Sequence, residues 1–160
     1  YCVLYWLHGE LGGALLGWRK HDLDRWTSCV HREVKWLYWL LEQAVAEGRL
    51  QPCILVAAFG YGYGCWADQR DAELGEILPA ETALLRELVP HVDAAYRTVR
   101  GPSGRWLAGH GAGASGALAL AAGHRDVFGA CALWDPCLAP EDARGSLLRA
   151  FQGDAALLAA

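Results

Sequence analysis

The sequence predicts an α/β fold, a three-layer αβα sandwich in which helices cover both faces of a mainly parallel sheet. Apolar runs that suit buried strands alternate along the chain with segments of helical periodicity. Strands connected through helices in this way run parallel, with right-handed crossovers. Hydrophobic residues make up 54% of the 160 residues, enough to build a sizeable core. We therefore expect one domain over residues 1–160.

Four apolar runs predict the strands of this sheet. Each is continuous rather than alternating, as in strands that are buried on both faces. The last run would leave an open apolar edge, which soluble proteins normally avoid, and the first begins at residue 1 without a preceding turn. We therefore expect the sheet to be incomplete at both ends of the chain. The four runs are Tyr1–His8, Pro52–Phe59, Arg105–His110 and Gly129–Trp134.

The segments between these runs predict helices. Apolar residues recur at helical spacing in the first two, and Pro90 is expected to kink or restart the second. Trp36 and Trp39, on the first helix, are expected to pack in the core, as aromatic side chains usually do. The third segment consists mostly of small residues, and a short helix is expected in the tail. The four segments are Ser28–Glu47, Pro79–Val99, Gly111–Ala122 and Glu141–Phe151.

Composition and charge exclude several classes of partner. The net charge is −4, and the 14 basic residues are scattered, so neither nucleic acid nor an anionic membrane surface is an expected partner. No apolar stretch reaches the roughly 18–20 residues that span a bilayer. We expect a small-molecule ligand, and no cofactor.

The six cysteines are interpreted as reduced core thiols. No C-x-x-C pair occurs, and Cys2, Cys53 and Cys131 fall within the predicted strands, where cysteine acts as a small hydrophobe. A disulfide framework or a metal site is therefore disfavoured. This usage favours a reducing compartment such as the cytoplasm.

The end of the third strand carries the most informative motif. In an open parallel sheet, ligands bind beyond the carboxyl ends of the strands. There the chain reads Gly109-His110-Gly111-Ala112-Gly113, a strand that turns at once into a helix. This is the pattern of a nucleophile elbow, G-x-S-x-G, with glycine at the position of the serine. Flanking glycines are needed because the sharp turn brings backbone and helix close together.

Several segments in the same order resemble the putative-esterase family of α/β-hydrolases, which includes esterase D, feruloyl esterases and mycolyltransferases. The resemblance runs from Tyr1 to about Pro140. It is carried by four segments, namely Leu4–Gly9 with Gly12, Gly13 and Trp18; Glu87–Asp93 with Tyr96–Thr98; Ala108–Gly113; and Gly116–Leu118 with His124, Asp126 and Phe128–Ala130.

The resemblance implies a catalytic site whose nucleophile is missing. Gly111 occupies the position of the family's serine, so the acyl-enzyme route is closed there, and loss of that serine costs on the order of 10⁶ in kcat. The main-chain N–H groups of Glu10 and Ala112 would form the oxyanion hole. Ser115 is interpreted as a packing residue rather than a substitute nucleophile. No histidine follows His124, so the base of a triad is not identified.

Residues around this position are candidates for a ligand pocket. The histidines can bind a polar group of a ligand, or can be satisfied by backbone as ordinary strand-end residues. The aromatic residues can line an apolar acyl pocket, although turn formation alone explains the glycines beside them. Asp135 sits where some hydrolases place their acid, but Asp135-Pro136 is equally a turn signal. The pocket candidates are His8, Trp18, Tyr61, Tyr63, Trp66 and His110.

Three functions remain open at this point. The first is a carboxylic-ester hydrolase or acyltransferase scaffold of the serine-esterase type, inactive in this form. The second is a non-catalytic homologue that binds an ester or acyl ligand. The third is a truncated fragment without independent function.

Overall fold

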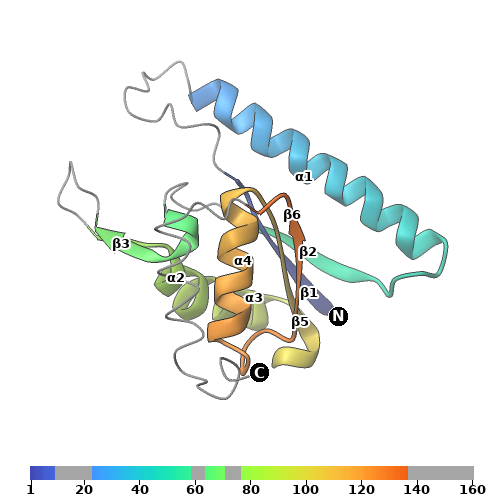
Figure 1. The fold of residues 1–160 in the computed structure, drawn as a ribbon. Helices are drawn as coiled ribbons and strands as arrows, with labels where there is room; N and C mark the ends of the chain where they lie inside the picture. The colour runs from blue at the N-terminus through green and yellow to red at the C-terminus, as the bar shows by residue number, and fades with distance from the viewer. Residues whose placement is uncertain (10–22, 59–63, 71–76, 137–160) are drawn as a thin grey trace, which may run out of the picture.

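A four-stranded parallel sheet lies at the centre of the molecule (Figure 1). The computed structural model describes residues 1–9, 23–58, 64–70 and 77–136. The strand order is β2-β1-β5-β6 and every neighbouring pair is parallel, so β1 and β5 are central. The predicted α/β class is confirmed. The strands are β1 (Cys2–Leu7), β2 (Cys53–Ala58), β5 (Arg105–His110) and β6 (Ala130–Trp134).

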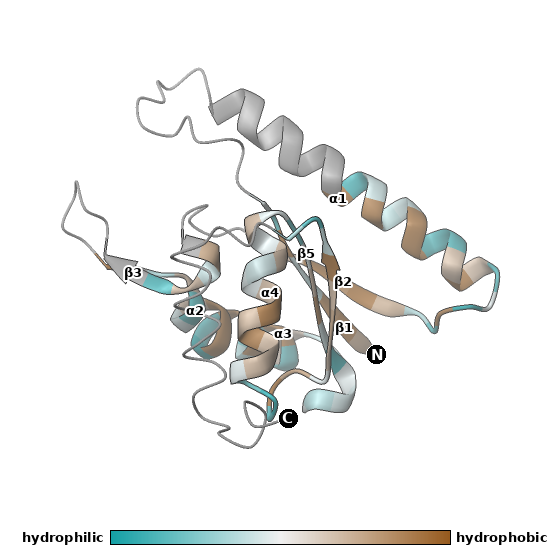
Figure 2. Cartoon of the chain, viewed as in Figure 1, coloured by the Kyte–Doolittle hydropathy of each residue, from teal (hydrophilic) through white to brown (hydrophobic). Residues whose placement is uncertain are grey.

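Helices pack on both faces of the sheet, as the sandwich requires. Successive side chains of a strand point to opposite faces, so β1 sends Val3, Tyr5 and Leu7 into one core and Leu4 and Trp6 into the other. The first core also contains residues of α3 and α4, and the second contains residues of α1. Figure 2 shows the described part of α1 alternating between hydrophobic and hydrophilic residues, as expected for a helix that covers one face. The helices are α1 (Leu23–Ala46), α2 (Ala80–Ala83), α3 (Val89–Ala95) and α4 (Ala112–Gly123).

The helix predicted over Pro79–Val99 is divided and shorter than expected. A π-helical segment, Leu84–Leu88, separates α2 from α3, and the chain leaves the helix at Tyr96, which is extended. The N–H of Val89 reaches back five residues to the carbonyl of Leu84. Pro90 follows in the first turn of α3, where its missing N–H costs little. The wide turn therefore accommodates the proline that was expected to kink the helix.

Short elements between the main strands were not predicted. A two-stranded antiparallel sheet pairs β3 (Asp68–Arg70) with β4 (Ile77–Pro79). Two 3₁₀ turns, η2 (Gly64–Trp66) and η4 (Pro102–Gly104), precede β3 and β5. Elements of three residues are too short to show a hydrophobic period. In addition, α1 begins at Leu23 rather than Ser28, whereas the tail helix predicted at 141–151 lies outside the described residues.

Burial contradicts the prediction at several positions. Trp36 and Trp39 are 56% and 53% exposed, because Val34, Leu37 and Leu41 form the stripe of α1 that packs on the sheet. The edge strands are also less buried than predicted, since only β1 and β5 have neighbours on both sides. The cysteines follow this pattern. Cys2 and Cys53 are partly exposed, and Cys131 is exposed.

A buried polar cluster lies beneath the amino ends of the strands. Asp93 of α3 forms an ion pair with Arg105 and accepts a 2.7 Å hydrogen bond from the Thr98 hydroxyl. Burial alone would raise the pKa of Asp93, but these hydrogen bonds and the Arg105 charge lower it below its ordinary value. The hydroxyl of Tyr5 is buried without a hydrogen-bond partner. Burial, reinforced by the Asp93 charge, raises the pKa of Tyr5 to about 12.

Among the described helices, none combines the length and the hydrophobicity needed to cross a bilayer.

Candidate active site

The chain makes a tight corner between β5 and α4. β5 ends at His110, Gly111 has φ 56° and ψ −123°, and α4 begins at Ala112. The N–H of Gly111 donates to the carbonyl of Trp134 on β6 at 3.0 Å. Its own carbonyl accepts the N–H of Ser115 at 3.2 Å and a second helix N–H at 3.0 Å. Backbone hydrogen bonds on both sides therefore hold residue 111 in a conformation that residues other than glycine rarely adopt.

Two glycines that flank this corner are required by close packing. A Cβ atom on Gly109 would lie 2.3 Å from the carbonyl oxygen of Gly113. A Cβ on Gly113 would lie 2.0 Å from the carbonyl oxygen of Leu7, in β1. Both distances are far below van der Waals contact, so α4 can approach the sheet this closely only without these side chains. These two close contacts explain why glycine stands two residues before and two residues after position 111.

Position 111 itself has room for a side chain. The nearest heavy atom to a Cβ built there is the Cα of Gly9, at 3.7 Å, an ordinary contact. The corner therefore faces the end of β1, where the segment expected to carry the oxyanion loop begins. With respect to the described residues, a Cβ at 111 is opposed by the positive φ alone, and strain of this kind costs about 1–3 kcal/mol.

One of the two expected oxyanion donors lies within the described structure. Ala112 is the first residue of α4, and the N–H groups of a helix's first turn have no partner within the helix. The N-terminal end of a helix also carries partial positive charge, which favours a developing anion. Glu10, Trp18, Tyr61 and Tyr63 lie outside the described residues, so their predicted roles stay predictions.

His8 and Trp66 meet next to the corner. The His8 side chain is buried, and its Nδ1 lies 3.1 Å from the carbonyl oxygen of Gly9. The indole N–H of Trp66 donates to the backbone carbonyl of His8 at 3.2 Å. The His8 and Trp66 rings meet edge to face, with 5.2 Å between the ring centroids. Trp66 is itself buried and packs against Gly116 of α4. These contacts fix the end of β1 against α4.

His110 and Trp134 lie side by side at the ends of the neighbouring strands β5 and β6. They are register partners on β5 and β6. Their rings meet edge to face, with 6.3 Å between the ring centroids. The ring of Trp134 in turn meets the ring of Trp36 in α1, with 6.0 Å between the ring centroids. Sequence reasoning did not single out Trp134 as a site residue. Its place at the carboxyl end of a predicted strand, level with His110, was the available signal.

Unusual backbone conformations concentrate at this edge of the sheet. Within the described segments, three residues other than glycine have positive φ, namely Cys65, Trp66 and Asp135. Cys65 and Trp66 pack on Gly116, and Asp135 directly follows β6. Such strain persists where the surroundings enforce it and is common at functional sites. Its position agrees with the carboxyl edge as the candidate site.

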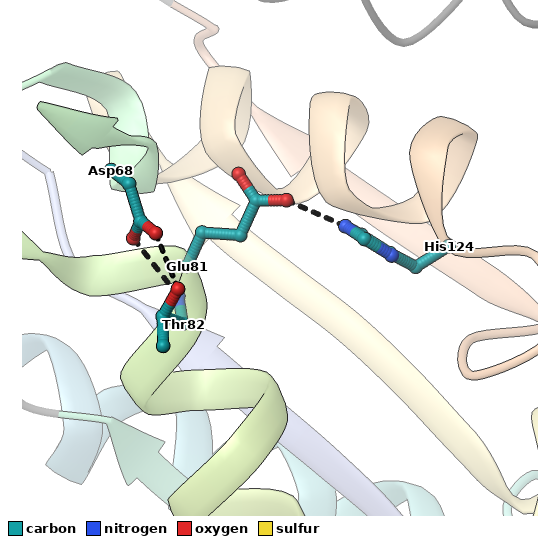
Figure 3. Close-up of polar contacts among 4 residues, drawn as sticks. All are labelled: Asp68, Glu81, Thr82 and His124. Carbon is teal, nitrogen blue, oxygen red and sulfur yellow. Dashed lines mark hydrogen bonds and ion pairs between the residues drawn. The ribbon is translucent and has the colours of Figure 1, made fainter.

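Ser115 lies within α4 and His124 at its C-terminal end. The Ser115 side chain is buried, and its hydroxyl lies 3.4 Å from the carbonyl oxygen of Gly111. His124 caps the far end of the 12-residue helix α4, about 18 Å from its start. Its Nε2 lies 2.6 Å from a carboxylate oxygen of Glu81 (Figure 3). His124 therefore ties α4 to α2 and stays away from the corner.

The carboxylate of Asp68 fixes the other side of α2. It accepts the backbone N–H of Thr82 at 2.9 Å and also the Thr82 hydroxyl (Figure 3). Asp68 thereby satisfies a first-turn donor of a helix that has no side-chain cap of its own. The described segments contain no group of three or more His, Cys, Asp or Glu side chains suited to a metal ion.

Comparison with known proteins agrees with the geometry of the corner. The family model described as Putative esterase matches residues 1–151. The chain belongs to this family. None of the curated proteins matches it. A solved structure of a ferulic acid esterase is similar, with a TM-score of 0.60 and 23% sequence identity. That similarity covers 93% of this chain and 53% of the esterase, so the chain spans about half of that structure.

The family and the shared fold give the chain the scaffold of an esterase-type hydrolase. Within that scaffold, β5 and α4 are joined directly at Gly111 by a tight turn.

Proposed function

We propose that this chain is a carboxylic-ester hydrolase or acyltransferase scaffold that binds small esters at the carboxyl edge of β5 and lacks its nucleophile in this form. The observation that carries the proposal is the conformation of Gly111, with φ 56° and ψ −123° between a buried parallel strand and a helix. Glycine adopts this conformation readily, whereas residues with a side chain rarely do. A nucleophile elbow uses such a conformation, because it lifts one side chain above the sheet.

The site as it stands can bind an ester but cannot attack it at residue 111. Glycine has no hydroxyl, so no covalent acyl intermediate forms there. The main-chain donor of Ala112 does not depend on the side chain at 111, and with that of Glu10 it would polarise an ester carbonyl. Each such donor is worth about 10²–10³ in rate when a nucleophile is present. Ligand binding therefore survives the loss of the serine, and hydrolysis does not.

Histidine and tryptophan side chains lie around residue 111. Trp134 and His110 contact each other at the ends of β6 and β5, and His8 follows β1. Trp134 is 54% exposed, so an apolar acyl or alcohol group has a surface to contact. We assign the ester's apolar portion to this side of the corner.

A p-nitrophenyl butyrate assay tests the proposal. The chain and the Gly111→Ala variant are expected to release p-nitrophenol no faster than buffer. Gly111→Ser is expected to release p-nitrophenol faster than Gly111→Ala, because both variants keep the main-chain oxyanion donors and only serine supplies a hydroxyl that can attack the ester. Adding Ser115→Ala to Gly111→Ser should change little. Hydrolysis by the unchanged chain at the rate of Gly111→Ser would contradict the proposal, because another nucleophile would then be at work.

The alternative is a ligand-binding homologue without any catalytic capacity. It is favoured by the same glycine, which relieves strain at the corner while leaving the main-chain donors in place. Binding of the ester by the chain, measured by ligand-observed NMR, together with no turnover by Gly111→Ser would decide for this alternative.

A further inference from the structure

Two cysteines are paired directly across the strands β1 and β2. Cys2 and Cys53 are register partners at the start of the parallel ladder, and both are free thiols with partly exposed side chains. Neighbouring strands lie about 4.8 Å apart. A disulfide needs Cα atoms about 4.4–6.8 Å apart, so the pairing places these residues within bonding range.

Both side chains lie on the same face of the sheet. Side chains two residues apart along a strand share a face. Cys2 therefore shares the face of Leu4, and Cys53 shares the face of Leu55. Leu4 and Leu55 belong to the same core, the one on the α1 side. The two sulfur atoms therefore stand next to each other on that side and are not separated by the sheet.

The environment of Cys53 agrees with this proximity. Burial raises the pKa of the Cys53 thiol above its ordinary value, and the neighbouring Cys2 raises it further. A charge on one sulfur is therefore unfavourable beside the other. The described cysteine Cys131 offers a contrast, since its register partner is Leu107 and it has no thiol across the strand.

We propose that Cys2 and Cys53 form an oxidative modification site, at which a small disulfide such as oxidised glutathione converts the pair into a reversible cross-strand disulfide. The thiolate of one cysteine attacks the small disulfide, which releases one glutathione thiolate and leaves a mixed disulfide. The second cysteine, after losing its proton to solvent, displaces the other glutathione. The protein loses two electrons and two protons, and two molecules of reduced glutathione are formed.

The disulfide would link the edge strand β2 covalently to the central strand β1. It would close a loop from residue 2 to residue 53 that contains α1, and closing a long loop restricts the unfolded chain. The pair lies at the amino edge of the sheet and residue 111 at the carboxyl edge, so oxidation would leave the candidate site open.

Peptide mapping after oxidation tests this site. The reduced chain is incubated with oxidised glutathione, its remaining thiols are alkylated, and its proteolytic peptides are analysed by mass spectrometry. We expect one linked peptide pair joining Cys2 and Cys53, lost on treatment with dithiothreitol. Cys131→Ser, the matched control, should give the same linked pair. Cys2→Ser should give only a glutathione adduct on Cys53, and Cys2→Ala serves the same purpose if the serine variant does not fold.

Two results would overturn the site. One is separate glutathione adducts on Cys2 and Cys53 in the folded chain with no linked pair. The other is a linked pair that appears only after denaturation in urea, which would show that the folded sheet keeps the sulfur atoms apart.

Discussion

Replacing Gly111 by alanine isolates the cost of the strained corner. Among the residues that the structure describes, a Cβ at this position meets nothing closer than the Cα of Gly9, at 3.7 Å, so steric overlap with them contributes little. The remaining cost is the φ of 56°, and strain of this type is about 1–3 kcal/mol. For a chain of this size, each kcal/mol lowers Tm by about 2–4 °C. We expect Gly111→Ala to lower Tm by roughly 2–12 °C, measured by circular dichroism.

Gly48 supplies the matched control for this substitution. It also has positive φ, at 70°, and no atom lies within 4 Å of a Cβ built there. It lies in an ordinary left-handed conformation after α1, where alanine costs about 1–2 kcal/mol. Gly48→Ala should therefore destabilise the chain no more than Gly111→Ala does. An unchanged or raised Tm for Gly111→Ala, beside a lowered Tm for Gly48→Ala, would refute the strained corner.

Three further substitutions test the packing around the sheet. Gly113→Ala should destabilise the chain more than Gly111→Ala in urea unfolding, since its Cβ would lie 2.0 Å from the Leu7 carbonyl oxygen; an equal cost would contradict the close approach of α4. Asp93→Asn should cost about 1–3 kcal/mol at pH 7. Because the folded pKa of Asp93 is lowered, this stabilisation is present above the unfolded pKa of about 3.9 and is lost as pH falls through the folded value, so the two proteins should converge in acid. Tyr5→Phe should be neutral or stabilising at pH 7, because the hydroxyl has no partner. Its folded pKa of about 12 exceeds the ordinary tyrosine pKa of about 10, so native stability should fall as pH rises between these values and Tyr5→Phe should resist that fall.

The sequence predicted the elements that depend on long hydrophobic patterns. The apolar run over Tyr1–His8 became the central strand β1, and Arg105–His110 became β5 with the predicted bounds. The motif at Gly109–Gly113 predicted the corner because glycine spacing reports directly on backbone approach. These features are local, so a single sequence contains the information for them.

Features that depend on tertiary neighbours were missed. Trp36 and Trp39 are large apolar residues of the kind that usually pack in a core. They are exposed because another face of α1 packs on the sheet. For the run Gly129–Trp134 the open edge was expected, but the exposure of every residue of β6 was not. Trp134 joined the site through a backbone hydrogen bond to Gly111, which no sequence spacing encodes.

Acylation at residue 111 tests the esterase scaffold most directly. The Gly111→Ser variant is mixed with p-nitrophenyl butyrate, quenched in acid, and mapped by peptide mass spectrometry, beside Gly111→Ala treated in the same way. We predict a single butyryl group at residue 111 of the serine variant and none in the alanine variant. A butyryl group on another residue, or an unmodified residue 111 in a folded serine variant that binds the ester, would contradict the placement of the nucleophile at this corner.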